Sequence, residues 1–300
     1  MYDIIIVGAG TAGLSAAIYG VRAGKSVLIL EENTYGGQII NSAEVENYPG
    51  IKRISGYEFA TNLYEQAIDL GAKIEYEKVV KIKENGNSKT VITLKKEYEC
   101  KSIILATGAK NRPLGLSRED ELVGAGISYC ATCDGAFFRG KDVGVAGGGN
   151  TALEDAMFLS AYCNKVYIVH RRDSFRGEEK LVASLKKKEN VEFVLNSNII
   201  KLVGGDRIEG ILVQDKDTKK EKLIPISGLF IAIGQIPENS CFEEIIDLDQ
   251  GGYIMAVEDC KTKVDGIFTA GDCRTKKVRQ LATAAADGAV AGLAACEFIG

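Results

Sequence analysis

The chain has 300 residues, a length that suits two domains better than one. Its hydrophobic content of 46% and charged content of 26% are ordinary for a globular protein, and its net charge of -4 excludes an extended basic surface for nucleic acid. Charged or polar residues interrupt the apolar runs before the roughly 20 residues of a membrane span, and the N-terminus lacks a basic leader, so we expect a cytoplasmic protein.

The first predicted strand, residues 2–7, is an apolar run that leads directly into a glycine-rich turn, a helix and a second strand. In this pattern Gly8 allows the tight turn, Gly10 lets a pyrophosphate approach the backbone, and Gly13 lets helix and strand pack closely. Glu31 ends the second strand, where a carboxylate can accept hydrogen bonds from ribose hydroxyls. The stretch predicts a site for FAD or NAD.

Two polar loops follow, which are either plain connections or loops that lie along the same cofactor. They are Tyr35, Gly36, Gly37 and Gln38, and then Glu46, Asn47, Tyr48, Pro49 and Gly50. We expect a helix over 56–70 and strands around 73–82 and 90–94. Another buried strand ends in the small residues Ala106, Thr107 and Gly108, as if it met the same ligand, and residues 110–113 form the first predicted linker.

The second half repeats the logic of the first. A strand at 142–146 leads into a G-x-G-x-x-A turn and a helix, with the residues Gly147, Gly149, Asn150, Thr151 and Ala152. The next strand ends in His170, Arg171 and Arg172, with Arg176 close behind. Guanidinium groups suit a 2′-phosphate, which a carboxylate would repel. The turn therefore predicts an NADPH site; a solvated arginine cluster is the alternative.

A charged helix is expected over 177–188, with strands near 191–195, 199–203 and 208–214, and a run over 228–234 that leads to the second linker at Pro237. The last strand ends at Gly271 and Asp272, and Asp272 could bind a polyol chain. Arg279 and Gln280 then open a helix with small residues on one side, which permits close backbone packing. The N-terminus of that helix could stabilise negative charge on a reduced ring system.

Between the two glycine-rich turns lies Cys130-Ala131-Thr132-Cys133-Asp134, which could be a redox pair, half of a zinc site or two ordinary thiols. Zinc needs about four ligands, and the chain has a single histidine, so we expect no metal. Asp134 is either a turn-capping residue or an acid-base group for the thiols. The remaining cysteines are expected to be buried inert thiols: Cys100, Cys163, Cys241, Cys260, Cys273 and Cys296.

Together these motifs, in this order, resemble the low-molecular-weight thioredoxin reductases over nearly the whole chain. The resemblance implies an α/β fold of two Rossmann-like three-layer nucleotide-binding domains, in which an FAD domain is interrupted by an inserted NADPH domain that carries the CxxC pair. The corresponding boundaries are 1–112 and 240–300 for FAD, and 113–239 for NADPH. The resemblance also implies a homodimer and a large domain rotation during turnover.

The same resemblance implies an enzyme that passes electrons from NADPH through FAD and the Cys130–Cys133 disulfide to the disulfide of thioredoxin. Cys133 would contact the flavin, Cys130 would attack the partner disulfide, and Asp134 would act as acid-base group. The implied FAD residues are Gly8, Gly10, Gly13, Glu31, Gly37, Gln38, Asn47, Ala106, Thr107, Gly108, Gly271, Asp272, Arg279 and Gln280. The implied NADPH residues are Gly147, Gly149, Asn150, Thr151, His170, Arg171, Arg172 and Arg176.

Several alternatives remain at this point. A reductase of the same fold could serve another thioredoxin-like partner, or could take its electrons from ferredoxin; the intact NADPH motif favours NADPH. A nucleotide-binding redox sensor or a zinc-binding module would use the cysteines without turnover. Neither of these needs two complete nucleotide sites.

Overall fold

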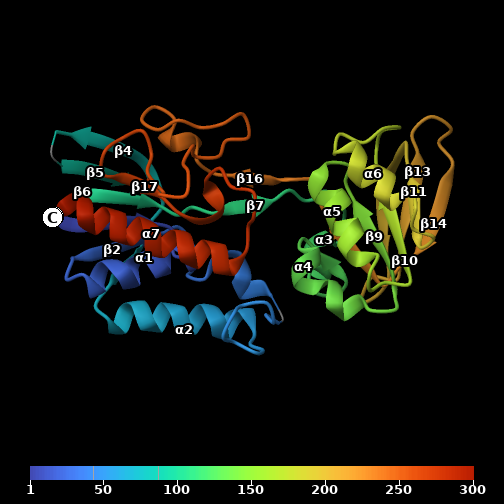
Figure 1. The fold of residues 1–300 in the computed structure, drawn as a ribbon, viewed down its shortest axis with the longest axis horizontal. Coiled ribbons are helices and arrows are strands. Elements are labelled where there is room, and N and C mark those ends of the chain that lie inside the picture. Colours follow the sequence, from blue (N-terminus) through green and yellow to red (C-terminus); the bar gives the residue numbers. More distant parts are fainter. Residues whose placement is uncertain (43, 87) are drawn as a thin grey trace. The chain divides into compact units, whose positions relative to one another are not determined.

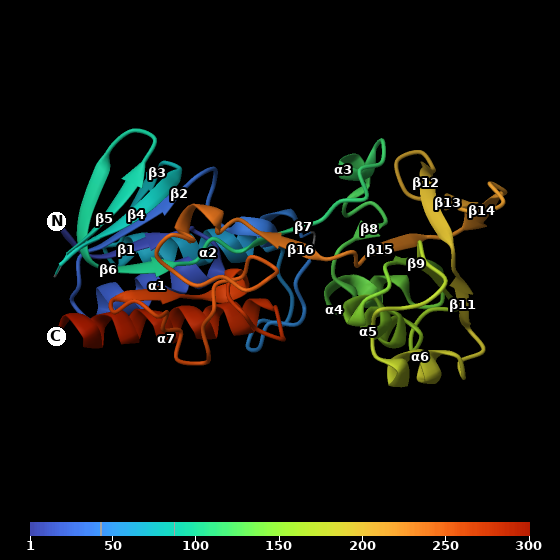
Figure 2. The ribbon, with the colours of Figure 1, turned by 90° about the horizontal axis from the view of Figure 1, so that it is seen from above.

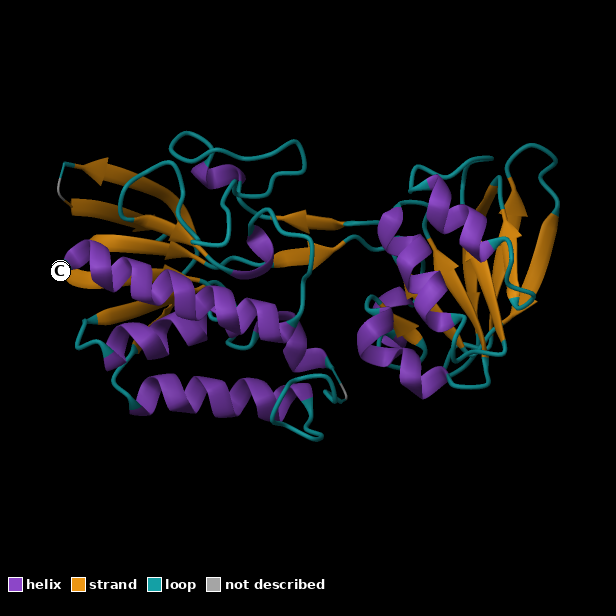
Figure 3. Ribbon diagram, in the orientation of Figure 1, coloured by secondary structure: helices purple, strands orange, loops and turns teal. Residues whose placement is uncertain are grey.

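The structure is a computed structural model that describes residues 1–42, 44–86 and 88–300. The chain forms two compact units, one made of Met1–Lys110 with Ile236–Gly300 (unit 1) and the other of Asn111–Gln235 (unit 2) (Figure 1). Both units combine helices with β-sheets, so the α/β class that the resemblance implies is confirmed (Figure 3).

Unit 1 is built on a seven-stranded sheet in the order β3-β2-β1-β6-β5-β4, with β17 beside β6. The strands are β1 (Tyr2–Val7), β2 (Val27–Glu31), β3 (Lys73–Tyr76), β4 (Val79–Asn85), β5 (Ser88–Thr93), β6 (Glu97–Leu105) and β17 (Ile267–Thr269). Strands β1, β2, β3 and β17 pair in parallel, whereas β4 and β5 are antiparallel. The region 73–82 is divided between β3 and β4, which lie at opposite edges of the sheet. The carboxyl ends of β1 and β6 lie next to each other and carry the first glycine-rich turn and the Ala106–Gly108 segment.

Three helices cover one face of this sheet: α1 (Thr11–Arg22), α2 (Gly56–Asp69) and α7 (Leu281–Ile299). The short helices η1 (Gly37–Asn41), η3 (Ser240–Phe242) and η4 (Gly271–Cys273) lie in the connections. Helices α1 and α7 lie side by side (Figure 2). Their backbones approach closely because a Cβ at Gly288 would lie 2.2 Å from the carbonyl oxygen of Ala12, and one at Gly292 would lie 2.8 Å from that of Ala16. The close packing predicted for the small-residue face is confirmed.

Helix α7 is the one helix in the described part of the chain that is long and apolar enough to cross a membrane, by length and composition only. No such run was predicted from the sequence, but only the charged residues Asp287 and Glu297 interrupt this one. The helix carries Asp287 in a buried ion pair and packs against α1. Those contacts are the ones that a core helix makes.

Unit 2 has a parallel sheet in the order β11-β10-β9-β15-β8. Helices cover one of its faces, and an antiparallel sheet covers the other, so the unit has three layers. The parallel strands are β8 (Ile127–Ser128), β9 (Asp142–Ala146), β10 (Lys165–Val169), β11 (Val191–Val194) and β15 (Gly228–Ile231). The helical layer contains α5 (Asn150–Leu159) and α6 (Glu179–Leu185). The antiparallel layer consists of β12 (Ser197–Val203), β13 (Gly210–Asp215) and β14 (Glu221–Pro225). The short helices of the unit are α3 (Glu119–Leu122), α4 (Ala131–Asp134) and η2 (Gly135–Phe138).

The chain passes between the units along β7 (Ala109–Asn111) and returns along β16 (Gln235–Pro237), and these two strands pair with each other. Beside them the Arg112 amide donates to the Gly234 carbonyl at 3.0 Å, and the Gln235 amide group donates to Asn111 Oδ1 at 3.0 Å. Both ends of unit 2 therefore lie at neighbouring points.

Candidate functional site

The first glycine-rich turn connects β1 to α1. Gly8 has φ +105°, a left-handed conformation that favours glycine, and a Cβ at Gly13 would lie 1.9 Å from the Gly8 carbonyl oxygen. At Gly10 a Cβ would meet no atom within 4 Å, so this side of the turn has room for a bound group. The Glu31 carboxylate accepts a hydrogen bond from the Ala9 amide at 2.8 Å. Glu31 thus stabilises the turn through this hydrogen bond, in addition to the ribose contact expected of it.

The polar loops after β2 lie beside this turn. Gly10 forms a β-bridge with Gly36, and a Cβ at Gly37 would lie 3.5 Å from Gly10 Cα. The Gln38 amide group donates to the carbonyl oxygen of Ala109, the first residue of β7. The structure therefore brings the first of the two loops to the turn.

Small residues after β6 line the same edge of the sheet. The Ala106 amide donates to the Val7 carbonyl at 2.8 Å, and the Thr107 hydroxyl donates to Asn239 Oδ1 at 2.7 Å. Gly108 has φ +69° and no atom within 4 Å of a Cβ built on it. A group bound at Gly10 would thus find a second stretch of open backbone.

Asp272, in η4, lies at the carboxyl end of β17. Its Oδ1 is buried and has no hydrogen-bond partner within the described part of the chain, and burial raises the pKa of the carboxyl group. A buried oxygen without a partner is costly, so a hydroxyl donor from a ligand would satisfy it. Next to it, Arg279 donates to the Asp272 carbonyl at 3.4 Å and packs over the Tyr253 ring at 4.3 Å.

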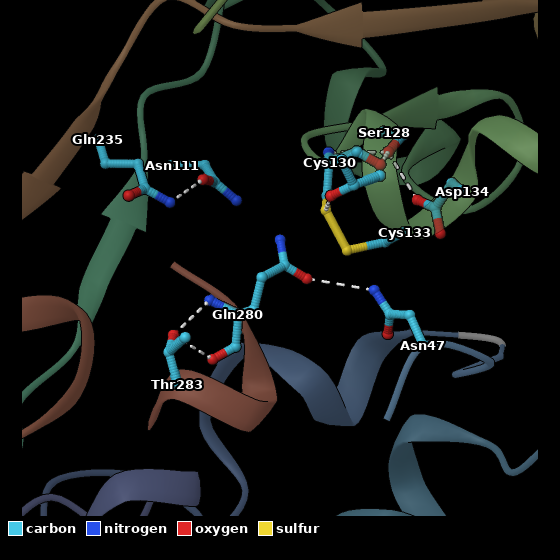
Figure 4. Close-up of a disulfide and its surroundings, with 10 residues drawn as sticks. Asn47, Asn111, Ser128, Cys130, Cys133, Asp134, Gln235, Gln280 and Thr283 are labelled. Atoms are coloured by element: carbon cyan, nitrogen blue, oxygen red, sulfur yellow. Dashed lines mark hydrogen bonds between the residues drawn. A yellow bond between two sulfur atoms is a disulfide. The ribbon is translucent and has the colours of Figure 1, made fainter. Parts of the chain in front are cut away.

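Helix α7 begins directly after these residues. Gln280 is its N-cap and forms a capping box with Thr283. The Asn47 amide group donates to Gln280 Oε1 at 3.2 Å, which joins the second polar loop to the start of α7 (Figure 4). The residues predicted around the first nucleotide therefore lie along one edge of unit 1.

A buried ion cluster, which the sequence analysis missed, holds the Gly271 turn against α7. Asp287 accepts two hydrogen bonds from the Arg274 guanidinium and one from Lys276 Nζ, each at 2.8 Å, and a fourth from the Gly271 amide at 3.0 Å. The side chains of Arg274, Lys276 and Asp287 are 2%, 5% and 8% exposed. An aspartate on the small-residue face of a helix was the available signal, because a carboxylate on such a face needs a partner.

The second glycine-rich turn connects β9 to α5. Gly147 has φ +153°, and a Cβ there would lie 2.4 Å from the Ala232 carbonyl oxygen. Gly149 is the N-cap of α5, and a Cβ there would meet no atom within 4 Å. Asn150 Oδ1 accepts a hydrogen bond from the Glu178 amide at 2.8 Å, whereas Thr151 is exposed. The turn has the same open approach as the first.

His170 packs directly on this turn, since a Cβ at Gly148 would lie 2.2 Å from its ring. The ring stacks on Phe175 at 5.4 Å and is 5% exposed, and its Nε2 has no hydrogen-bond partner among the described residues. Burial and repulsion from the nearby arginines lower the pKa of His170, which favours the neutral ring. The side chains that repel it are exposed: Arg171, Arg172 and Arg176.

Cys130 and Cys133 form a disulfide at the start of α4 (Figure 4). The amides of Cys133 and Asp134 both donate to the Cys130 carbonyl, at 3.3 and 3.1 Å, and this turn brings the two Cα atoms to 5.3 Å. No group of three or more metal-ligating side chains occurs within residues 1–42, 44–86 and 88–300. The pair is thus a disulfide in the structure.

The cysteines outside this pair differ in exposure. Cys100, Cys163, Cys260 and Cys273 are buried, and burial raises the pKa of Cys100 and Cys260 to about 12. Cys296 is half-buried. The expectation that all six are buried is therefore wrong for Cys296, and it is wrong for Cys241, which is exposed because its neighbour Phe242 occupies the core position of η3.

Asp134 lies at the C-terminal end of α4, and Ser128 at the end of β8 donates a hydrogen bond of 2.6 Å to its Oδ2 (Figure 4). Burial raises the pKa of Asp134, and the Ser128 hydrogen bond offsets part of that rise. A raised pKa makes this carboxyl group a better proton acceptor than an ordinary aspartate. The sequence analysis missed Ser128, because an isolated serine two residues before a cysteine matches no pattern.

Comparisons with known proteins agree with this arrangement. The model of the pyridine nucleotide-disulphide oxidoreductase family matches residues 2–289. Thioredoxin reductase of Listeria monocytogenes is 41% identical over 300 residues, which cover 100% of this chain and 94% of the relative. That of Bacillus subtilis is 39% identical and covers 100% and 95%. The solved structure of thioredoxin reductase from Streptococcus pyogenes is 38% identical, has a TM-score of 0.95, and covers 99% of this chain and 98% of that one. The chain therefore belongs to the pyridine nucleotide-disulphide oxidoreductase family, and within it to the thioredoxin reductases of the low-molecular-weight type.

Proposed function

We propose that this protein is an NADPH-dependent thioredoxin reductase that contains FAD and delivers two electrons through Cys130 and Cys133 to the disulfide of thioredoxin. The observation that carries the proposal is the Cys130–Cys133 disulfide, which lies beside the half-buried carboxyl group of Asp134 in a chain with two glycine-rich nucleotide turns. The family supports the use of a flavin and a pyridine nucleotide. Relatives named thioredoxin reductase support the partner.

Unit 1 is the FAD site in this proposal. The turn at Gly8, Gly10 and Gly13 would bind the pyrophosphate, Glu31 the adenosine ribose and Asp272 the ribityl hydroxyls. The open Cβ positions and the buried oxygen without a partner at Asp272 fit such a ligand. The other proposed FAD residues are Gly37, Gln38, Asn47, Ala106, Thr107, Gly108, Gly271, Arg279 and Gln280. When bound, FAD would accept a hydride from NADPH and reduce the disulfide.

Unit 2 is the NADPH site. The N-terminus of α5, with Gly147, Gly149, Asn150 and Thr151, would bind the pyrophosphate. The 2′-phosphate would find Arg171, Arg172 and Arg176, three exposed guanidinium groups that form no ion pair within the described part of the chain. His170 would supply its unpartnered Nε2 at the edge of that site.

The dithiol would perform the exchange with thioredoxin. The Cys130 thiolate would attack one sulfur of the partner disulfide and release the other as a thiolate, which forms a mixed disulfide. Cys133 would then displace the partner and restore the Cys130–Cys133 bond. The partner leaves with two thiols, whose two protons balance those that the Cys130 and Cys133 thiols lose, and Asp134 would manage the proton at the adjacent sulfur.

We further propose a cytoplasmic homodimer, with FAD bound by residues 1–112 and 240–300 and NADPH by 113–239. Gel filtration with light scattering tests the dimer, for which one monomer mass of 32.2 kDa would contradict the proposal.

An anaerobic NADPH titration followed by absorbance, with thioredoxin from the same source added afterwards, tests the function. NADPH should bleach the flavin, and oxidised thioredoxin should restore its absorbance in repeated cycles. Cys130→Ser and Cys133→Ser should each abolish thioredoxin reduction and preserve bleaching. The proposal fails if both variants still reduce thioredoxin. Bleaching by reduced ferredoxin and not by NADPH would assign the ferredoxin-dependent alternative instead.

A further inference from the structure

The Ser128 hydroxyl lies at the centre of the hydrogen bonds around the CxxC turn (Figure 4). Its Oγ is 2.6 Å from Asp134 Oδ2, 3.3 Å from the Cys130 carbonyl oxygen and 3.0 Å from the Cys130 amide, which donates to it. Ser128 is 4% exposed. A hydroxyl has one hydrogen, so it cannot donate fully to both oxygens at once.

The state of Asp134 decides which oxygen receives that hydrogen. While Asp134 is ionised, its carboxylate only accepts, and the charge-assisted bond from Ser128 is the stronger choice. When Asp134 is protonated, its own O–H can donate to Ser128 Oγ, and the serine hydrogen becomes free for the Cys130 carbonyl. That carbonyl already accepts from the amides of Cys133 and Asp134, which define the turn holding the two sulfurs.

We propose that Ser128 is a positioning residue of the redox centre. Its hydroxyl donates a hydrogen bond to the Asp134 carboxylate, and it donates to the Cys130 carbonyl instead when Asp134 takes up a proton. The proton state of Asp134 is thereby linked to the backbone of the CxxC turn. The inference rests on the proposed acid-base role of Asp134. The one covalent change is the O–H bond that Asp134 gains or loses, whereas the Ser128 O–H bond stays intact, and the proton on Asp134 is the one that the thiol exchange releases or consumes.

Among the groups around Asp134, Ser128 is the main polar influence on its carboxyl group. Helix α4 packs against α5, which carries Glu154 and Asp155, and against η2, which Arg139 follows. Burial and the Ser128 hydrogen bond govern the pKa of Asp134. Tyr129, between Ser128 and Cys130, is engaged elsewhere, because its hydroxyl donates to Glu119 at 2.9 Å.

The test is the pH dependence of Cys130 alkylation in the FAD-loaded, dithiothreitol-reduced protein, with iodoacetamide and mass spectrometry of the Cys130 peptide. Exposed Cys241 serves as an internal reference for the reagent. In the wild type we expect an inflection that is absent from Asp134→Asn. Ser128→Ala should move that inflection upward by about one pH unit, since loss of a hydrogen bond to a carboxylate favours its protonated form. Ser128→Thr should stay within about 0.3 unit, because it keeps the hydroxyl.

Ser160→Ala is the matched control: Ser160 is 8% exposed in the same unit, and its hydroxyl donates to the Met157 carbonyl at 2.7 Å. It should leave the inflection unchanged. In the Asp134→Asn background, Ser128→Ala should have no further effect on the profile. The inference is overturned if Ser128→Ala superimposes on the wild type, or if its effect persists at full size without Asp134. Should Ser128→Ala fail to fold, Ser128→Gly replaces it, with an upward shift as the expected result and none as the refuting one.

These readings separate the inference from the proposed function. A profile that lacks an inflection dependent on Asp134 in the wild type refutes the acid-base role and this inference with it. A protein that shows the Ser128 effect but does not reduce thioredoxin refutes only the partner assignment.

Discussion

Asp287 is the buried anion that neutralises Arg274 and Lys276, and Asp287→Asn removes its charge while nearly preserving its shape. The variant leaves two buried cations facing a neutral amide. Glu258, the other carboxylate near Arg274, is 3.7 Å away and its side chain is 96% exposed, so it compensates little. The Gly271 amide, which donates to Asp287 at 3.0 Å, would in the variant donate to a neutral amide oxygen, so the support of the Gly271 turn weakens as well.

The magnitude follows from the burial. Removing one partner of a buried ion pair costs about 3–5 kcal/mol, because the remaining charge stays desolvated. That is a large part of the roughly 5–15 kcal/mol by which domains are stable. Burial raises the pKa of Asp287, but the hydrogen bonds from Arg274 and Lys276 outweigh it and lower the pKa overall. The stabilisation is thus present above the unfolded carboxyl pKa of about 3.9 and is lost as pH falls through the lower folded value.

Urea unfolding at pH 7 measures the effect, followed by circular dichroism because the chain has no tryptophan. The matched control is Asp247→Asn, which breaks an exposed pair with Lys263 whose side chains are 54% and 49% exposed. It should cost less than about 1 kcal/mol. Equal losses for the two variants would refute the reasoning. So would a gap between wild type and Asp287→Asn that stays constant below pH 4.

Three further predictions follow from the two turns. Gly13→Ala would place a Cβ 1.9 Å from a carbonyl oxygen of the turn, so the purified protein should contain little flavin, as its absorbance at 450 nm will report. Gly148→Ala would displace His170 and should raise the KM for NADPH at least about tenfold. The control is Gly205→Ala, whose Cβ would meet no atom within 4 Å and which should leave this KM unchanged. Equal KM values for the two variants would contradict the packing of His170 on Gly148. Arg171→Ala combined with Arg172→Ala should raise the KM for NADPH by about tenfold or more and leave the KM for NADH unchanged. An equal rise in KM for both nucleotides would rule out recognition of the 2′-phosphate by these arginines.

The parts of the fold that were predicted from the sequence are mainly those determined by residues close together in the chain. Gly13 is needed because a side chain there would strike the Gly8 carbonyl of the same turn, and that constraint is readable from spacing alone; the carbonyl of Ala106, which a side chain at Gly8 would strike, belongs to a distant strand. The apolar runs of the parallel strands are similarly explicit, because strands buried on both faces have no polar alternation. The division of residues 73–82 was not readable, since β3 and β4 separate only when the whole sheet is assembled.

The parts of the site that sequence reasoning missed depend on contacts between distant or patternless residues. Asp287 meets Arg274 only because α7 folds back onto the turn after β17. Ser128 matters because β8 ends beside α4, and its sequence neighbours give no periodic signal. Glu31 was expected to face a ribose, yet its carboxylate also accepts from Ala9, a contact that requires the turn geometry itself.

The pairing of β7 with β16 has a consequence for how the chain is assembled. Because Arg112 and Gly234 share a hydrogen bond, the two ends of unit 2 meet as the two arms of a hairpin do. For unit 1, the whole insertion replaces a tight turn, and closing it costs unit 1 little chain entropy once unit 2 has folded. A short glycine-containing turn that joins Lys110 to Ile236 should therefore be geometrically compatible with the sheet of unit 1, and a gene could gain or lose such a cassette without rerouting any strand.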